Sequence, residues 1–322
     1  MSLFSLHDDR GPGAAVEISG HRISGVRLDA RGADRVVAAH ATEVLADGML
    51  VPSLTSLNVH NRAGVVRALN RVLEAIGRPR RIGLVVPDPV AKISMVKFQH
   101  VPTRAGELDQ LVRWQIKKTS PFPLEEAQVT YAPVSSSADG QEYLVSVARR
   151  DVIAEYESIC DEAGAYAGLV DLSTTNVVNA VLAIDARRDR DVRVVNVARE
   201  WASLAVIRAG QIALIRSRAA DGGETLADLV HQTAMYYEDR LGGTGFAQVF
   251  LCGATANGSA DGDAETLRRS LEARLGTSVS AVDPTSIVAL TDRTTTRCCL
   301  ERMTKRPSPT LLAPSSAVAS RA

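Results

Sequence analysis

The chain has 322 residues, 45% of them hydrophobic and 23% charged, which is the composition of a globular protein long enough for two lobes with separate cores. Its 37 Lys and Arg residues balance 37 Asp and Glu residues. A chain without net charge has no global field that would draw it to nucleic acid or to an anionic membrane, so we expect neither as a direct partner.

The N-terminus and the cysteines predict an intracellular protein. Residues 1–13 (MSLFSLHDDRGPG) lack the apolar core of a signal peptide. No uncharged apolar stretch approaches the roughly 18–20 residues that a membrane-spanning helix needs, so we expect no transmembrane segment. The cysteines fit neither a metal-binding CxxC pattern nor a disulfide framework, which favours reduced thiols. They are Cys160, Cys252, Cys298 and Cys299.

The same series of strands begins twice, about half a chain apart. In the first copy an apolar strand at 16–18 is followed by a polar turn at 19–22, a strand at 23–28 and a third strand at 36–44. The second copy repeats this order from residue 195 to residue 218, with its polar turn at 198–200. Two copies of strand–turn–strand–turn–strand predict two similar lobes that face a cleft.

A helix and a strand extend the first copy, and a block of a different kind follows. Apolar residues at helical spacing predict a helix from 61 to 76, and residues 81–87 form a buried strand. Residues 92–163 predict a small inserted α+β subdomain. Its elements are a strand at 92–98, a helix at 104–118, strands at 128–134 and 142–148, and a helix capped by Asp151 that ends near Gly164.

The second half extends its copy in the same βββαβα order. A strand at 168–171 and a helix at 173–182 first complete the first half, and the charged run at 185–191 marks a hinge. The later elements are helices at about 224–241 and 264–275 and strands at 248–251 and 278–282. We therefore expect an α/β protein with mixed sheets flanked by helices.

These elements divide the chain into two lobes and a tail. Lobe one spans 14–188 and includes the insertion at about 92–163, and lobe two spans 189–293. From 294 to 322 Thr, Arg, Ser and Pro dominate and periodicity is lost, so we expect an irregular, poorly ordered tail. We hypothesise that the native terminal segment is replaced there, as a frameshift would do.

The sequences of several segments resemble those of one protein family. Two βββαβα lobes, each with a polar turn after its first strand, resemble the superfamily of actin, sugar kinases and the large heat-shock ATPases. Within it, VRWQI at 112–116 followed by SPFPLEE at 120–126 is similar to a stretch of the type IV pilus assembly proteins of the PilM type. Further similar segments follow in order: GLVD at 168–171, GGETL at 222–226, Tyr236-Tyr237, and VFLCGA at 249–254.

The resemblance covers about residues 14–290 and implies a fold and a role. The fold is an α/β, actin-like (ribonuclease H-like) two-lobe fold with a small inserted α+β subdomain, similar to that of the cell-division protein FtsA. The role is that of a cytoplasmic structural adaptor, peripheral to the inner membrane through a partner. That partner would be the N-terminal cytoplasmic tail of a PilN-like inner-membrane protein, and self-association or contacts with other pilus motor components would be further interactions.

Such a tail would be bound as an added strand at a sheet edge or in a groove between lobe one and the inserted subdomain. Aromatic residues of the insertion are the candidates to line that groove, although each residue of this kind is more often part of a core. They are Phe98, Trp114, Phe122 and Tyr131.

The resemblance also raises the question of ATP. In the superfamily each first turn reads Asp-x-Gly, where the acid handles Mg²⁺ or its water and the glycine lets backbone N–H groups approach phosphate. Here the first turn carries Glu17, whose longer side chain displaces the carboxylate, and the second carries Asn196, which is neither a base nor a strong Mg²⁺ ligand. Arg199 could clamp a phosphate or be a solvated turn residue.

We therefore expect a degenerate nucleotide site and no cofactor, with ATP and Mg²⁺ as the alternative. Its candidate residues are Glu17, Ser19, Gly20, Asn196, Ala198, Arg199, Gly222, Gly223, Cys252, Gly253 and Ala254. The histidines have neither a partner at i+4 nor a neighbouring cysteine, so we expect no metal site. Two other functions stay open: an active actin-like ATPase, and a component of a type II secretion machine similar to GspL, which normally continues into a membrane span.

Overall fold

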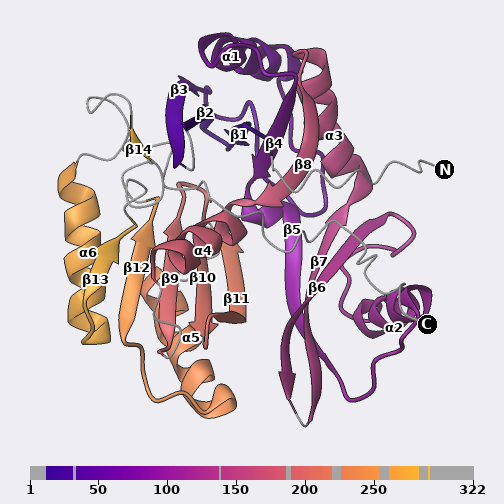
Figure 1. The fold of residues 1–322 in the computed structure, drawn as a ribbon, viewed down its shortest axis with the longest axis vertical. Coiled ribbons are helices and arrows are strands. Elements are labelled where there is room, and N and C mark those ends of the chain that lie inside the picture. The colour runs from indigo at the N-terminus through magenta and orange to yellow at the C-terminus, as the bar shows by residue number, and fades with distance from the viewer. Residues whose placement is uncertain are drawn as a thin grey trace.

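The structure, a computed structural model, describes residues 12–31, 34–137, 139–185, 190–219, 226–253, 261–282 and 289–290. These residues form three sheets with helices packed against them (Figure 1). Two larger sheets form the two lobes, and a smaller sheet forms the insertion. The predicted actin-like α/β architecture, in which one arrangement of strands is used twice, is confirmed.

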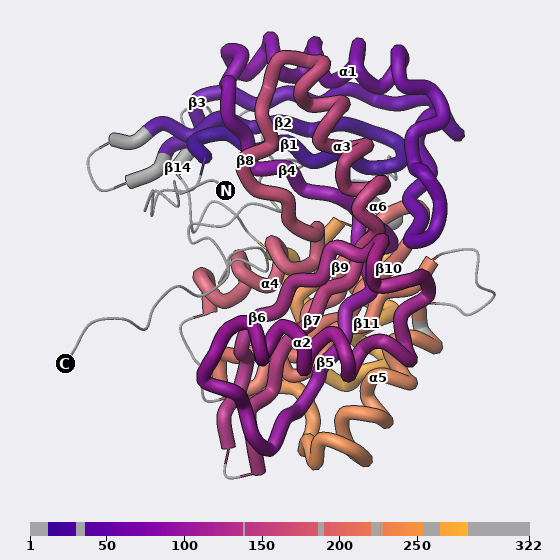
Figure 2. Tube along the Cα trace, turned by 90° about the vertical axis from the view of Figure 1, so that its right-hand side faces the viewer, coloured from indigo at the N-terminus to yellow at the C-terminus, as the bar shows by residue number. Residues whose placement is uncertain are grey.

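The first sheet has the strand order β14-β3-β2-β1-β4-β8. Its strands are β1 (Ala14–Ile18), β2 (Arg22–Arg31), β3 (Asp34–Val44), β4 (Arg81–Val86), β8 (Tyr166–Leu172) and β14 (Ala289–Leu290). Strands β1, β2 and β3 are antiparallel, whereas β4 pairs in parallel with both β1 and β8. Helices α1 (Arg62–Ala75) and α3 (Arg150–Glu162) lie side by side on one face (Figure 2), where apolar residues of both helices share one core with the sheet.

The start, the buried face and the end of helix α1 are each explained by its residues. The Asn61 side chain accepts a hydrogen bond from the Gly64 N–H (2.9 Å), which satisfies one of the free donors at the start of the helix. The helix then buries Val65, Leu69 and Val72. Gly77 adopts a φ of +87° directly after the helix, a left-handed conformation that glycine accepts without strain.

The second sheet has the order β11-β10-β9-β12-β13. Its strands are β9 (Val192–Val197), β10 (Trp201–Arg208), β11 (Gln211–Ala219), β12 (Gln248–Cys252) and β13 (Val279–Ala281). Helices α5 (Leu226–Leu241) and α6 (Asp261–Leu275) pack on the face that carries Val195 and Val249. Helix α4 (Ser173–Ile184) packs on the other face, against Val192 and Val194.

Two elements depart from the lobe boundaries expected from the sequence. Helix α4, which a boundary at 188 places in lobe one, buries Val177, Val178 and Val181 against the second sheet. Strand β14, which we placed in lobe two, pairs in parallel with β3 of the first sheet. In both cases the chain crosses between lobes, so a single cut in the sequence does not separate the two cores.

The insertion is a sheet with the order β5-β7-β6 and one helix. Its elements are the 3-10 turn η1 (Asp88–Val90), β5 (Ala91–Phe98), α2 (Ala105–Ile116), β6 (Ala127–Ser137) and β7 (Gly140–Arg149). Because side chains alternate along a strand, Val129, Tyr143 and Val145 face α2 and form a core with it. Thr130 and Ser146 point to the other face of the sheet, toward lobe one.

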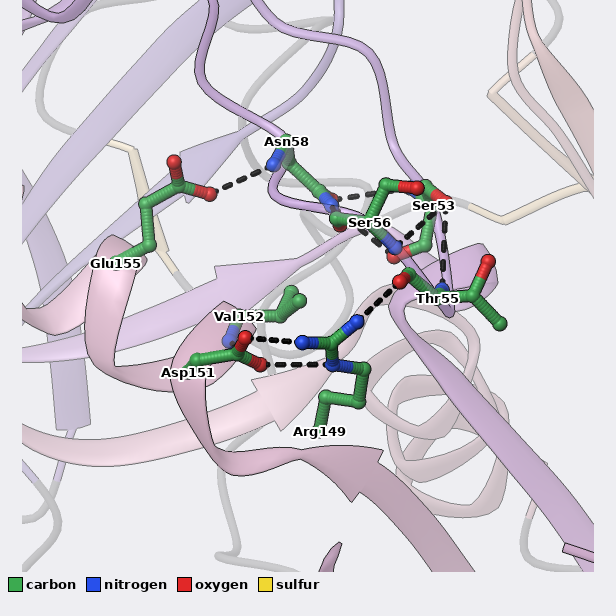
Figure 3. Close-up of polar contacts among 8 residues, drawn as sticks. All are labelled: Ser53, Thr55, Ser56, Asn58, Arg149, Asp151, Val152 and Glu155. Atoms are coloured by element: carbon green, nitrogen blue, oxygen red, sulfur yellow. Dashed lines mark hydrogen bonds and ion pairs between the residues drawn. The ribbon is translucent and has the colours of Figure 1, made fainter. Parts of the chain in front are cut away.

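The loop at 51–59 ties lobe one to α3 (Figure 3). The Asn58 N–H donates to Glu155 Oε2 (2.7 Å), and the Arg149 guanidinium donates to the Thr55 carbonyl oxygen. We expected Asp151 to cap α3, but the cap residue is Arg149 and has no side-chain cap bond. Asp151 lies in the first turn and accepts from Arg149 Nε (2.9 Å), so the helix begins two residues earlier than expected.

The expected hinge at 185–191 is partly described. Asp185 and Arg190 flank its central residues and pair with each other, Arg190 Nη2 lying 2.9 Å from Asp185 Oδ2. Residues 186–189 are outside the described part of the chain. The expected irregular tail at 294–322 lies wholly outside it as well.

Candidate functional site

Two short turns, one after the first strand of each lobe, lie close together at the junction of the lobes. In the turn between β1 and β2, the N–H and the hydroxyl of Ser19 both donate to the Arg22 carbonyl oxygen, each at 2.9 Å. In the turn between β9 and β10, the Ala198 N–H donates to the Trp201 carbonyl oxygen at 2.8 Å. The two turns occupy equivalent places in the two lobes, as the sequence repeat predicts.

The Glu17 carboxylate has a counter-ion within its own lobe. Its Oε2 atom lies 3.5 Å from Arg22 Nη2, and the two side chains are only 10% and 5% exposed. Arg22 belongs to the same turn that carries Ser19. The negative charge expected to face a metal ion is therefore already paired.

The second turn places charged groups against lobe one. A Cβ atom on Gly20 would lie 3.0 Å from Glu200 Oε1, and His21 Nδ1 lies 3.4 Å from the same oxygen. Burial raises the pKa of Glu200, but the contact and charge of His21, a backbone hydrogen bond and the charge of Arg199 together hold that pKa below its usual value. Arg199 is 54% exposed and pairs with Asp47 of lobe one at 2.9 Å. The Glu200 carboxylate thus fills the space beside Gly20.

A buried polar cluster joins the lobes behind these turns. Asp88, the first residue of η1, accepts hydrogen bonds from the Thr174 N–H (2.9 Å), the Thr174 hydroxyl and the Ser203 hydroxyl. Asn196 Nδ2 donates to the hydroxyls of Ser173 (3.2 Å) and Thr174 (2.9 Å) at the start of α4. All five side chains are at most 1% exposed, and together they connect η1, α4, β9 and β10. The Asn196 amide therefore holds the end of β9 to the start of α4.

The remaining candidates for the nucleotide site are only partly described. Cys252 ends β12 and pairs in register with Asn196, so the two strand ends are adjacent. Gly253 follows with a φ of +77°, a conformation suited to glycine. Gly222, Gly223 and Ala254 lie outside the described residues. Glu17, Ser19, Gly20, Asn196, Ala198 and Arg199 gather at the junction, whereas Cys252 and Gly253 border it.

A groove lies where lobe one meets the inserted sheet. It encloses a cavity of about 290 Å³. Its walls come from the edge strand β8, from α3 and from the lobe-facing side of the insertion. The residues are Val86, Ala91, Gln128, Thr130, Ser146, Ala148, Arg150, Ile153, Glu157, Val170, Asp171 and Leu172. A groove at this place was predicted, and its lining is a mixture of apolar walls and a few polar groups, as in many binding sites.

Two carboxyl groups in this groove hold protons to higher pH than usual. Burial raises the pKa of Asp171 to about 6, although hydrogen bonds from the Thr175 hydroxyl (2.6 Å) and the Leu172 N–H (2.8 Å) favour its charged form. At the exposed rim, partial burial and the charge of Asp161 raise the pKa of Glu157. A cationic or hydrogen-donating group in the groove would stabilise the charged form of both carboxyl groups.

The aromatic residues expected to line this groove lie elsewhere. Phe98 is buried in the core that the inserted sheet shares with α2, and Tyr131 meets Tyr143 edge-on in the same core. Phe122 packs on that core too, while Trp114 on α2 is 70% exposed. The prediction was wrong for groove lining, because the odd-numbered positions of β6 face α2 and the even-numbered ones face lobe one.

Sequence reasoning missed Asp88, Glu157 and Asp171 as site residues. Asp88 and Asp171 each stand at or near the carboxyl end of a buried parallel strand, a place where polar groups gather in α/β proteins, and that position was the available signal. Glu157 offered no such signal in the sequence, since acidic residues are common on amphipathic helices. Their proximity depends on how the insertion folds back on lobe one, which no local pattern encodes.

A family model for the type IV pilus assembly protein PilM matches residues 15–241, more than two thirds of the chain. The chain belongs to the PilM family. This result confirms the resemblance found in the sequence. A search of curated proteins found no match.

Solved structures confirm the fold of this PilM family member. One structure, described as a PilM–PilN type IV pilus biogenesis complex, is similar with a TM-score of 0.74 and 17% identity, covering 87% of this chain and 91% of that one. A Bacteroides thetaiotaomicron protein with an actin-like ATPase fold and unknown function has a TM-score of 0.50 and 10% identity, covering 88% and 95%. At such identities these likenesses show the fold alone.

Among the described residues, no helix is long and apolar enough to cross a membrane. In that same part of the chain, no group of three or more His, Cys, Asp and Glu side chains is arranged to hold a metal ion.

Proposed function

We propose that this PilM family member is a cytoplasmic adaptor of a type IV pilus or related machine that binds the N-terminal cytoplasmic tail of a PilN-like inner-membrane protein. The observation that carries the proposal is the groove between β8 and the inserted sheet. The family match and the likeness to a PilM–PilN complex support the choice of partner. Binding to that partner would hold the adaptor at the inner membrane.

The groove suits an extended peptide for two reasons. Strand β8 ends the first sheet, so its outer edge can pair with the backbone of an added strand. Beside that edge, Ala148, Ile153 and Val170 offer apolar contact. Asp171 and Glu157 outnumber the single Arg150 in the lining, which favours a tail that carries a basic residue.

We further propose that the nucleotide site is degenerate. Arg22 already pairs with Glu17 and would repel a divalent cation placed there. The Glu200 carboxylate beside Gly20 would repel phosphate oxygens, and Asn196 is committed to Ser173 and Thr174. These residues do not fit a magnesium triphosphate. The type II secretion alternative has less support, since the matching family model is that of pilus assembly.

Blocking the groove should weaken partner binding. A synthetic peptide with the N-terminal cytoplasmic residues of a PilN-like protein from the same organism would be labelled, and its binding to this chain would be measured by fluorescence anisotropy. Thr130→Tyr places a large side chain in the groove and should weaken binding by about tenfold to a hundredfold, the equivalent of a 1–3 kcal/mol steric cost. Ser136→Tyr makes the same kind of change at an exposed position of β6 outside the groove and should bind like the wild type.

Equal losses in Thr130→Tyr and Ser136→Tyr would show that the groove is not the binding site. A wild-type protein that fails to bind the peptide would overturn the adaptor proposal itself. Circular dichroism of both variants should match the wild type, which excludes unfolding as the cause of a loss.

Magnesium ATP should leave the thermal unfolding midpoint unchanged. A ligand that binds only the folded protein adds about 2.7 kcal/mol of stability at a concentration 100 times its Kd, an effect that differential scanning fluorimetry detects easily. ADP and a non-hydrolysable ATP analogue serve as parallel probes. A saturable rise in the midpoint with any of them would favour the ATPase alternative over the degenerate site.

A further inference from the structure

Lobe two contains a buried arginine without a hydrogen-bond acceptor. Arg193 lies near the start of β9 and is 0% exposed. Its Nε, Nη1 and Nη2 atoms have no hydrogen-bond partner among the described residues. Buried guanidinium groups are normally paired with a carboxylate or with carbonyl oxygens, because loss of hydration is costly. Arg193 is therefore an anomaly that the adaptor function does not explain.

The surroundings of Arg193 compensate its charge only in part. The guanidinium stacks on the Phe246 ring, with Cζ 3.9 Å from the ring centroid. Burial lowers the pKa of Arg193 to about 10, and the charge of Glu238 opposes that shift without a hydrogen bond. Because this pKa is still well above 7, the guanidinium remains positively charged at neutral pH. None of its three nitrogen atoms donates a hydrogen bond within the described residues.

Arg193 is one of the residues that line a cavity of about 410 Å³. It lies between α5, α6 and the amino-terminal end of β9, whereas Asn196 and the interlobe turns lie at the other end of that strand. Met235, Phe246 and Leu275 give it apolar walls. Arg274 joins Arg193 in the lining, and Glu238 is the one carboxylate among the lining residues described.

We propose that this cavity binds an organic carboxylate with a small apolar body. A planar guanidinium offers two parallel N–H groups, which match the two oxygens of a carboxylate. The apolar walls select for a hydrocarbon or aromatic body, and the volume is within the range of small-molecule sites. The carboxylate can come from a free metabolic acid or from the C-terminus of a peptide. Either source satisfies the buried guanidinium.

Benzoate is a suitable probe, and benzyl alcohol keeps its ring while removing the charge. By isothermal titration calorimetry, benzoate should bind saturably and benzyl alcohol at least tenfold more weakly. Arg193→Met should lower benzoate affinity by roughly tenfold to a hundredfold, the usual effect of losing hydrogen bonds to a charged group. Its unfolding midpoint should equal or exceed that of the wild type, since an unpaired buried charge is replaced by an apolar chain.

Two further variants make the test specific. Ala234→Leu narrows the cavity with a good helix former, keeps Arg193, and should also weaken benzoate binding. Arg269→Met changes an exposed arginine of α6 outside the cavity and should leave benzoate affinity unchanged. Absence of benzoate binding to the wild type, or equal affinity in Arg193→Met, would overturn the proposal.

The source of the carboxylate is then resolved with a hydrophobic tripeptide and its C-terminal amide. Binding of the free-acid peptide but not of the amide would assign the cavity to a peptide C-terminus. Binding of benzoate without either peptide would assign it to a free acid. Equal binding of the acid and amide peptides would contradict recognition through the carboxylate.

Discussion

Asp88→Ala should destabilise the protein by about 3 to 5 kcal/mol, because it leaves buried donors of both lobes without their acceptor. Asp88 accepts three hydrogen bonds, from the N–H and hydroxyl of Thr174 and from the hydroxyl of Ser203. These groups are fully buried, so water does not replace the lost acceptor without disturbing the packing. Urea unfolding followed by fluorescence should report the loss, since Trp201 is buried at the start of β10, the strand that carries Ser203.

Two variants calibrate this loss. Asp88→Asn keeps one acceptor oxygen and should cost less than Asp88→Ala. Asp47→Ala removes an exposed partner of Arg199 and should cost less than about 1 kcal/mol, as exposed ion pairs contribute little. If Asp88→Ala unfolds at the same urea concentration as Asp47→Ala, the buried cluster does not hold the lobes together.

Asn58→Ala should cost about 3 kcal/mol and loosen the loop at 51–59, since one fully buried amide satisfies four groups. Asn58 Nδ2 donates to the carbonyl oxygens of Ser53 (3.0 Å) and Ser56 (2.7 Å). Asn58 Oδ1 accepts from the Ser53 N–H (3.1 Å) and the Tyr156 hydroxyl (3.0 Å). Alanine keeps none of these bonds, so hydrogen exchange of the loop amides should accelerate.

The same loop supplies its controls. Tyr156→Phe removes one of the four bonds and should cost about 1 kcal/mol. Thr55→Ala changes an exposed side chain and should stay within about 0.5 kcal/mol of the wild type. Unchanged exchange rates at 51–59 in Asn58→Ala would show that other contacts fix this loop, such as that between Arg149 and the Thr55 carbonyl oxygen.

The sequence predicted what depends on periodicity and on the internal repeat. The alternation along β2 and β10 and the helical spacing around Leu69 are local properties, and they located the strands and helices of both lobes. The similarity of the segments around Trp114 and at 120–126 to sequences of the PilM family predicted the fold and the family. The groove itself was predicted because the insertion interrupts lobe one between β4 and β8.

Other features depend on contacts that no local pattern carries. Strand β6 alternates, but the sequence does not say which of its faces meets α2, so Tyr131 was assigned to the wrong side. Helix α4 follows β8 in the chain and packs on the second sheet because its apolar face matches Val192 and Val194. Glu200 was not singled out, because its importance comes from Gly20 across the junction.

The hydrogen bonds of Asp88 have a mechanical consequence. Rotating one sheet against the other would break the bonds that Asp88 accepts from Thr174 and Ser203, and all three side chains are at most 1% exposed. We expect the two lobes to move as one rigid body. A pulling force applied by a partner peptide bound near β8 would then be transmitted to lobe two without rotation between the lobes.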